Sequence, residues 1–290
     1  MKLRKAVIAA AGLGTRLLSV TKELPKEMLP VFFMSKDGNL SVKPLLQMVF
    51  EQLYRNGFRE FCFIVGRGKR SVEDHFTPDW KFVEELNNKG KESLALDLQE
   101  FYRMVESSTV VWVNQPEPKG FGHAILQAKP FVGDEPFMAL AGDTYIISPR
   151  DNHLRRLMDG YIKSKAEATL LLEWVSNPKI YGVAVLEEET EGLFKVKGVV
   201  EKPEKPPSNW AIMPLYVFKS SIMDALSETG PGIGGEIQLT DAIQKLIMDG
   251  RKVTAVTLDK SEVRLDIGTP NMYWEALKTS HEYWRKTWKQ

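Results

Sequence analysis

Apolar runs and helical spacings alternate along the first half of the chain. Mostly apolar runs at 5–10 and 60–65 each predict a strand that is buried on both faces. Between them, the apolar residues of 43–56 recur at helical spacing, and Gly57 is a typical residue to end such a helix. The pattern continues with predicted strands at 109–113 and 135–141 and predicted helices within 69–76, 81–104 and 121–129. Strands that alternate with helices predict a parallel sheet covered by helices on both faces.

The second half of the chain is richer in predicted strands. These lie near 167–174, 181–186, 193–200, 211–218, 253–258 and 262–267, with one helix at 236–249. The polar segment 34–42 predicts a surface hairpin. The last predicted helix, 270–288, carries an aromatic stripe at four–three–four spacing, which we expect to dock on the core or on another subunit. The stripe comprises Leu277, His281, Trp284 and Trp288.

The first thirty residues contain the most informative motif. The strand at 5–10 runs directly into a glycine-rich turn, Ala11–Arg16, and Lys26 follows inside the proline-bounded stretch Pro25–Pro30. Glycines at the end of a strand let backbone N–H groups approach phosphates and a base. Arg16 and Lys26 bring fixed positive charge to the same turn. We therefore predict a nucleoside triphosphate site in an enzyme that handles nucleotides.

Other interpretations of this segment fit less well. A dinucleotide-binding turn needs a small third residue in G-x-G-x-x-G/A, where this chain has Leu17. The P-loop pattern is matched neither here nor at Gly66–Arg70. A secretory signal would explain an apolar run after a basic N-terminus, but the run is short and stops at Arg16. A plain strand and turn with no ligand stays open as an alternative.

Composition narrows the class of protein. The chain has 290 residues and a formal net charge of +1, so no overall field favours nucleic acid or an anionic membrane. No apolar run reaches the roughly 20 residues needed to cross a bilayer. Cys62 is the only cysteine, which excludes an intramolecular disulfide and fits a reducing cytoplasm. The 4 histidines show no spacing typical of a zinc site.

Charged residues at predicted strand ends are further candidates. Asp143 follows one apolar strand, and Asp266 lies at the end of another. Two carboxylates in such places can hold Mg²⁺ against substrate phosphates, although a lone Asp after a strand is often a helix cap or turn residue. Glu201 and Lys202 form an acid–base pair at a third strand end, where a solvated salt bridge is the simpler interpretation.

A loop rich in glycine follows the strand at 109–113. It begins with Gln115 and includes Gly120. The Gln115 amide can read both a carbonyl and an N–H of a pyrimidine, while a plain strand-to-helix connection is the alternative. We expect His123 to be structural. Because ligands bind beyond the carboxyl ends of the strands in such sheets, Gln115 and Asp143 are predicted to converge with Gly12.

Ten stretches, in order along nearly the whole chain, carry a family resemblance. They are Ala11–Arg16, Pro25–Pro30, Lys43–Gln47, Ser71–Phe76, Lys119–Ala124, Gly133–Pro136, Tyr181–Val183, Val199–Pro203, Pro207–Asn209 and Gly235–Ile243. Together they resemble the sugar-nucleotide pyrophosphorylases, most closely the UTP–glucose-1-phosphate uridylyltransferases of bacterial and archaeal type. The resemblance implies an α/β fold, a Rossmann-like three-layer sandwich with a mixed, mostly parallel sheet. It also implies a single domain over 1–290, with a nucleotide-binding half of about 1–145, a sugar-binding and metal-completing half of about 146–269, and a C-terminal helix.

The same resemblance implies a role for each candidate residue. The turn is expected to bind the nucleotide through Ala11, Gly12, Leu13, Gly14 and Thr15, with Arg16 and Lys26 on the triphosphate and Gln115 and Gly120 on the uracil. The sugar hydroxyls are expected at Gly182 and Glu201, the sugar phosphate at Lys202, and Mg²⁺ at Asp143 and Asp266.

The implied reaction converts UTP and glucose 1-phosphate into UDP-glucose and pyrophosphate with Mg²⁺. The resemblance further implies a homodimer or homotetramer that binds neither nucleic acid nor a membrane. Gly142–Asp143 and Leu265–Thr269 are similar to motifs of the related thymidylyltransferases, so dTTP in place of UTP, or use of both, is one alternative. Galactose 1-phosphate is an alternative sugar substrate. A non-catalytic sensor of UDP-sugar is a third alternative, against which the intact charged residues argue.

Overall fold

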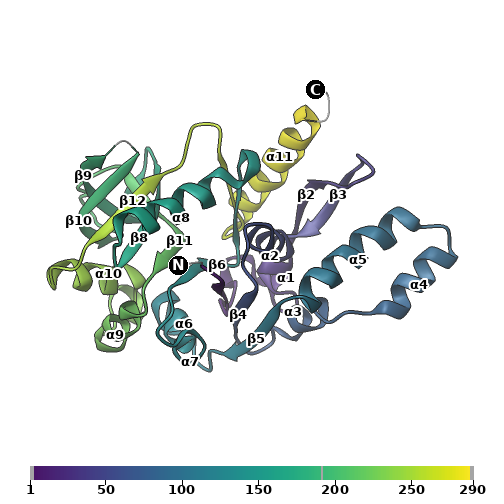
Figure 1. Cartoon of the computed structure of the whole chain (residues 1–290), viewed down its shortest axis with the longest axis horizontal. Coiled ribbons are helices and arrows are strands. Elements are labelled where there is room, and N and C mark those ends of the chain that lie inside the picture. Colours follow the sequence, from purple (N-terminus) through teal and green to yellow (C-terminus); the bar gives the residue numbers. More distant parts are fainter. Residues whose placement is uncertain (1–2, 191, 288–290) are drawn as a thin grey trace.

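A nine-stranded sheet runs through the molecule (Figure 1). The computed structural model describes residues 3–190 and 192–287. Along the sheet the strands follow the order β5-β4-β1-β6-β11-β8-β12-β10-β9. In chain order they are β1 Lys5–Ala10, β4 Glu60–Val65, β5 Thr109–Asn114, β6 Phe137–Ala141, β8 Ala168–Trp174, β9 Gly182–Thr190, β10 Leu193–Glu201, β11 Trp210–Phe218 and β12 Val253–Thr257. Because β10 and β11 run against the other strands, the sheet is mixed and mostly parallel, which confirms the predicted fold class.

The first four strands of this sheet end at one edge. In the parallel register Ala10 lies opposite Val65, and Val65 lies opposite Asn114. Strand β6 joins β1 on its other side, with Ala9 opposite Ala141. The turns that follow β1, β5 and β6 therefore leave from the same edge, as the topology predicts.

The strands of the second half close on themselves. Besides pairing with β10, β9 pairs with β11 through Val183 and Ala211. Strand β11 in turn pairs with β8, with Trp210 opposite Trp174. This ring of pairings brings the start of β9 back to the carboxyl end of β8.

Two small ribbons accompany the large sheet. One is the hairpin of β2, Pro30–Met34, and β3, Leu40–Pro44. The other joins β7, Thr144–Ile147, to β13, Val263–Asp266, from opposite ends of the sequence.

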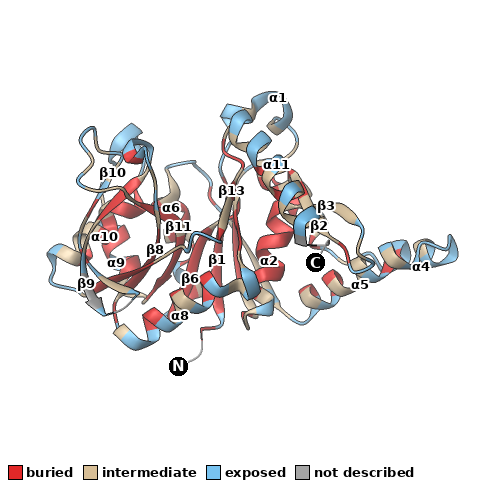
Figure 2. Ribbon diagram, turned by 90° about the horizontal axis from the view of Figure 1, so that it is seen from above, coloured by how far each residue is buried: buried red, intermediate tan, exposed pale blue. Residues whose placement is uncertain are grey.

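Helices cover both faces of the sheet. In β1, Ile8 belongs to a core cluster that includes residues of α2, α5 and α8, whereas its neighbour Val7 belongs to a second cluster with α6, α9 and α10. Successive side chains of a strand point to opposite faces, so the two clusters lie on opposite faces of the sheet. Each cluster packs the sheet against one layer of helices, which gives a three-layer sandwich. Figure 2 shows the buried residues concentrated in the central strands and in α2, while α4 is mostly exposed. The helices are α1 Leu18–Thr21, α2 Leu45–Arg55, α3 Arg70–His75, α4 Trp80–Asn88, α5 Glu92–Glu106, α6 Phe121–Gln127, α7 Lys129–Val132, α8 Asn152–Ser164, α9 Ser221–Glu228, α10 Leu239–Met248 and α11 Pro270–Thr287.

Several predicted elements differ from the observed ones. The helix expected within 81–104 is two helices, α4 and α5, separated by a turn with Gly90 at a φ of 69°, and they form the projecting hairpin at the right of Figure 1. The helix expected at 43–56 begins only at Leu45, because the two preceding residues belong to β3. Strand β7 and helices α8 and α9 were not among the predicted elements.

The C-terminal helix α11 packs against β2 and β13. Its His281 ring contacts Phe32 with ring centroids 5.1 Å apart, and Ser280 is fully buried. Trp288 of the predicted stripe lies outside the described residues. Among the helices that the structure describes, none is both long and apolar enough to cross a membrane.

Candidate active site

The glycine-rich turn after β1 is open to solvent. It starts with the buried Ala11, and its exposed residues include Gly12, Leu13 and Thr15. Gly14 adopts a left-handed backbone with a φ of 67°, which an L side chain rarely tolerates. The Thr21 hydroxyl donates to the Gly14 carbonyl oxygen at 2.8 Å and holds the turn in this conformation.

Lys26 lies against that turn. A Cβ placed on Gly12 would be 3.5 Å from the Lys26 Nζ. The same ammonium forms an ion pair with the Asp143 carboxylate. Burial by itself lowers the pKa of Lys26, but the negative charges of Asp143 and Glu27 outweigh burial and raise that pKa above its ordinary value. Lys26 is therefore a fixed cation beside the turn.

A buried ion pair anchors the segment that carries Lys26. The Lys69 Nζ lies 2.7 Å from a Glu27 carboxylate oxygen, and the two side chains are only 8% and 1% exposed. Burial raises the pKa of Glu27 although the Lys69 and Lys26 charges oppose the rise. This pair ties the turn of Lys26 to the loop that follows β4.

Asp143 and Asp266 lie side by side at the end of the β7–β13 ribbon. Thr144 pairs with Asp266, and the Ile267 N–H donates to the Asp143 carbonyl oxygen at 3.3 Å. The pKa of Asp266 is raised, first by burial and then by the negative charge of Asp143, while the Gly268 N–H and nearby cations partly lower it. The ribbon therefore brings together two carboxylates that are 123 positions apart in the sequence, as the numbers 143 and 266 show.

Arg16 of the glycine-rich turn and Asp266 both lie beside Gly268. A Cβ placed on Gly268 would lie 3.0 Å from Asp266 Oδ1 and 3.4 Å from Arg16 Nη2. The positive charge of Arg16 also acts on Lys26, whose pKa it lowers slightly against the larger effects. Four of the predicted site residues thus form one charged cluster, which comprises Arg16, Lys26, Asp143 and Asp266.

The cluster has the donor set of an incomplete divalent-cation site. No group of three or more His, Cys, Asp or Glu residues that could hold a metal occurs within residues 3–190 and 192–287. Mg²⁺ usually takes one or two carboxylates and completes its shell with substrate phosphates and water. The oxygen donors of Asp143 and Asp266 fit that pattern, and in this structure Lys26 supplies the positive charge beside Asp143.

Gln115 lies directly beyond β5 and is held on three sides. Its N–H donates to the Val65 carbonyl oxygen at 2.8 Å, and its side-chain Nε2 bonds to the Gly120 carbonyl oxygen at 3.2 Å and to the His123 Nδ1 at 2.9 Å. Burial lowers the pKa of His123, so its neutral ring can accept this hydrogen bond. His123 thus orients the amide of Gln115.

Gly120 is pressed against a distant segment. Its φ is 99°, and a Cβ there would lie 2.7 Å from the Glu236 Cβ and 2.9 Å from the Ile237 carbonyl oxygen. The Ile237 N–H donates to the Lys119 carbonyl oxygen at 2.8 Å, and its carbonyl oxygen accepts from the Gly122 N–H at 2.9 Å. The loop at 115–122 is therefore clamped by the residues that precede α10.

The sugar-side candidates meet where β9 begins and β10 ends. Gly182 pairs with Glu201, and a Cβ on Gly182 would lie 2.8 Å from the Thr240 hydroxyl and 3.0 Å from Glu201 Oε2. The Thr240 hydroxyl donates to Glu201 at 2.6 Å. The Glu201 side chain is only 12% exposed, so it is not part of a solvated edge. Gly182 itself is buried, and the Thr240 and Glu201 side chains fill the space where a larger side chain would lie.

Lys202 has an unusual backbone for a residue other than glycine. Its φ is 39°, and its N–H donates to the Tyr181 carbonyl oxygen at 3.0 Å. Such strain is typical of functional positions. The Lys202 Nζ lies 3.2 Å from Glu201, with its side chain 44% exposed. The surface hollow beside it is lined by Lys179, Lys202, Pro203, Glu204 and Lys205, a mainly positive surface that suits a phosphate.

Arg264 lies in this region but was not among the residues predicted from the sequence. Arg264 donates to the Asp266 carboxylate at 2.8 Å, to the Tyr181 hydroxyl at 3.0 Å and to the Glu173 carboxylate at 2.8 Å. The spacing of two between Arg264 and Asp266 on one strand was an available signal, because it places both side chains on one face. Lys69 gave no such signal, since its partner Glu27 is remote in sequence.

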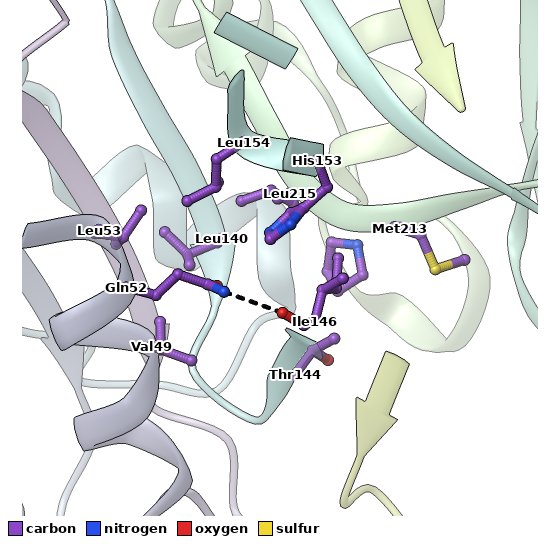
Figure 3. Close-up of a pocket in the computed structure, with 11 residues that line it drawn as sticks. Val49, Gln52, Leu53, Leu140, Thr144, Ile146, His153, Leu154, Met213 and Leu215 are labelled. Atoms are coloured by element: carbon purple, nitrogen blue, oxygen red, sulfur yellow. Dashed lines mark hydrogen bonds between the residues drawn. The ribbon is translucent and has the colours of Figure 1, made fainter. Parts of the chain in front are cut away.

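A small internal pocket is lined by residues of α2, β7, α8 and β11 (Figure 3). Thr144, which follows Asp143, is one of its lining residues, and the fully buried His153 is another. Neither ring nitrogen of His153 has a hydrogen-bond partner among the described residues, and burial lowers its pKa to about 4. The cavity volume of about 20 Å³ has room for one water molecule. Since this pocket is separate from the glycine-rich turn, it is not a candidate for substrate.

Comparisons with known proteins find relatives that match most of the chain. The family model described as "Nucleotidyl transferase" matches residues 5–282. A UTP–glucose-1-phosphate uridylyltransferase of Pseudomonas aeruginosa is 36% identical over 291 residues, which cover 99% of each chain. One of Bacillus subtilis is 41% identical over 249 residues, 84% of this chain and 80% of the relative. A crystal structure of UDP-glucose pyrophosphorylase complexed with UDP-glucose superposes with a TM-score of 0.82 at 34% identity, over 98% of this chain and 100% of the other.

Proposed function

This chain belongs to the nucleotidyl transferase family, and we propose on that basis that it transfers a uridylyl group from UTP to glucose 1-phosphate. The products are UDP-glucose and pyrophosphate. The chain is an enzyme of the UTP–glucose-1-phosphate uridylyltransferase type, like the relatives that it matches over most of their length. The names of these relatives do not favour a thymidylyltransferase.

One observation supports the proposal most directly. The structure brings Arg16, Lys26, Asp143 and Asp266 together beside an exposed glycine-rich turn. Phosphoryl transfer between anions needs positioning and charge neutralisation rather than a strong base. Two cations beside the turn and two carboxylates that can hold a divalent cation supply both requirements.

On the nucleotide side, backbone N–H groups of Ala11–Thr15 are proposed to bind the phosphates, and Arg16 and Lys26 to offset the charge of the α-phosphate and the departing pyrophosphate. Gln115 and Gly120 are proposed to read the uracil, with His123 fixing the amide. Nucleotidyl transferases of this family generally use a divalent metal. We propose Mg²⁺ at Asp143 and Asp266, where it would add Lewis-acid stabilisation of the phosphates.

On the sugar side, Gly182 and Glu201 are proposed to bind the sugar hydroxyls, and Lys202 to hold the sugar phosphate. A non-bridging oxygen of that phosphate forms the new bond to the α-phosphorus of UTP. The bond from this phosphorus to the oxygen of the β-phosphate breaks, and the electron pair leaves with pyrophosphate. No general base is required, because the attacking phosphate is already anionic near neutral pH.

The test is pyrophosphate release with Mg²⁺, in which UTP, dTTP, CTP, ATP and GTP are crossed with glucose, galactose and other sugar 1-phosphates. We expect release that requires both UTP and glucose 1-phosphate and that stops when EDTA is added. Strong release with dTTP alone would contradict the nucleotide assignment. Binding of UDP-glucose without release from any pair would contradict catalysis and support the sensor alternative.

We also propose that the chain assembles as a homodimer or homotetramer. The support is the family resemblance, together with the aromatic side chains of α11, of which Trp274 is 63% exposed. Sedimentation equilibrium tests this proposal, and a monomer at micromolar concentration would contradict it.

A further inference from the structure

We propose that Arg264 is a positioning residue that couples the Asp266 carboxylate to the sugar-binding segment. This inference rests on the proposed function, since it takes Asp266 as a cation ligand and Lys202 as a ligand of the sugar phosphate. It concerns how the two halves of the site are held relative to each other. Arg264 itself touches neither substrate.

The guanidinium group of Arg264 donates through three nitrogens, which we call its three arms. The first arm, Nη1, fixes the orientation of Asp266. Both residues lie on the same face of β13, and the Arg264 Nη1 donates to Asp266 Oδ2 at 2.8 Å. The other carboxylate oxygen, Oδ1, accepts from the Gly268 N–H at 2.8 Å. Each carboxylate oxygen can accept two hydrogen bonds or ligands, so acceptor capacity remains for a cation. Partners of this kind orient metal-binding carboxylates and raise their affinity for the metal.

The second arm reaches the sugar side. The Arg264 Nη2 donates to the Tyr181 hydroxyl at 3.0 Å, and the guanidinium carbon lies 5.3 Å from the centre of that ring. The Tyr181 carbonyl oxygen accepts the N–H of Lys202 at 3.0 Å. The next residue, Gly182, pairs with Glu201. One guanidinium therefore connects the Asp266 carboxylate with the segment that carries both sugar-side candidates.

The third arm holds the guanidinium in place. The Arg264 Nε donates to Glu173, at the carboxyl end of β8, at 2.8 Å. The Arg264 side chain is only 13% exposed. Three donors point in three fixed directions, and a lysine ammonium at this position keeps the charge but not this planar geometry. The Arg264→Lys variant therefore tests geometry separately from charge.

An arginine of helix α8 provides a matched control. Arg156 forms ion pairs with Glu262, next to β13, and with Asp259 at 2.8 Å. These partners are not candidates for binding a substrate or a cation. Arg156→Lys removes a comparable network without touching the coupling that we propose.

The experiment compares wild type with Arg264→Lys, Tyr181→Phe and Arg156→Lys. Binding of Mn²⁺ as the probe cation is followed by electron spin resonance at saturating UDP-glucose, and the KM for glucose 1-phosphate is measured by pyrophosphate release. We expect Arg264→Lys to weaken Mn²⁺ binding about tenfold or more and to raise this KM. Tyr181→Phe should raise the KM about three- to tenfold and leave Mn²⁺ binding within about twofold, because it removes only the second arm. Arg156→Lys should change neither quantity.

Three results would overturn the proposal. Wild-type Mn²⁺ binding and KM in Arg264→Lys would leave Arg264 a merely structural residue, as would a fall in kcat with both quantities unchanged. An unchanged KM in Tyr181→Phe would remove the coupling, and this variant decides the matter if Arg264→Lys does not fold. Absence of pyrophosphate release by wild type would instead count against the proposed function, while the Mn²⁺ titrations would still test the role of Arg264.

Discussion

The candidate site holds a lysine beside a carboxylate on each side, and this lysine is more buried on the nucleotide side than on the sugar side. On the nucleotide side, Lys26 and Asp143 pair with each other, and their side chains are 15% and 18% exposed. On the sugar side, Lys202 is 44% exposed and lies beside the mostly buried Glu201. Glu201 has a second partner in the Thr240 hydroxyl.

This difference indicates which substitutions disturb more than function. Removing one member of a buried pair leaves the other as an unpaired charge, which costs stability. Removing an exposed cation costs little stability, because solvent already screens it. We therefore expect changes on the nucleotide side to affect both folding and turnover, and a change of Lys202 to affect turnover alone.

Of these substitutions, Asp143→Asn should have the largest effect on turnover. It removes a proposed cation ligand and the charge that pairs with Lys26, so we expect turnover to fall by at least two orders of magnitude together with a lower unfolding temperature. Pyrophosphate release and thermal unfolding measure the two effects. Turnover close to that of wild type would remove Asp143 from its assigned role.

Lys202→Ala should lower turnover by about two orders of magnitude with little change in unfolding temperature. The reason is that Lys202 is proposed to hold the attacking phosphate, while Glu201 keeps its hydrogen bond to Thr240. The same two assays measure the result. A large loss of stability with full activity would reverse the contrast between the two sides.

Lys69→Met tests the buried anchor beneath the nucleotide side. Loss of the partner leaves Glu27 charged and buried, so we expect the free energy of unfolding to drop by about 3 kcal/mol or more near neutral pH. Urea unfolding at several pH values measures this drop. A variant as stable as wild type would show that the pair does not anchor the Lys26 segment.

The pH dependence of that variant has a defined sign. Burial raises the folded-state pKa of Glu27 above its ordinary value of 4.5. Folded protein therefore holds this proton more tightly, and stability falls as the pH rises from 4.5 through the raised pKa. Without the Lys69 charge the rise in pKa is larger, so Lys69→Met should lose more stability over this interval than wild type does.

Gly120→Ala should destabilise the fold less than Lys69→Met does. Its Cβ would meet the segment at Glu236 and Ile237, and its φ of 99° is unfavourable for alanine, so we expect a cost of about 1–3 kcal/mol and weaker UTP binding. Gly133→Ala is the matched control, because its φ is also positive but no atom lies within 4 Å of the added Cβ. Equal effects of both variants on UTP binding would contradict a role for the Gly120 contact.

Much of this architecture could be predicted from the sequence. The apolar runs at 5–10 and 60–65 became adjacent parallel strands, and the turns after them leave from one edge of the sheet. The family and its reaction were confirmed by relatives that match nearly the whole chain. Helix α8 was missed although Leu154, Leu157 and Tyr161 recur at helical spacing, so the local signal was present in the sequence. The roles assigned to individual site residues stay predictions.

The sequence by itself determined most of the elements and the chemical types of the candidate residues, because strand and helix periodicities and glycine-rich turns are local properties of the chain. Only the tertiary structure decided which of these residues meet. Asp143 and Asp266 become neighbours through the pairing of β7 with β13, and Arg264 reaches Tyr181 only because β9 closes back onto β11. These contacts join residues remote in sequence, and local patterns carry no information about which distant strands will pair.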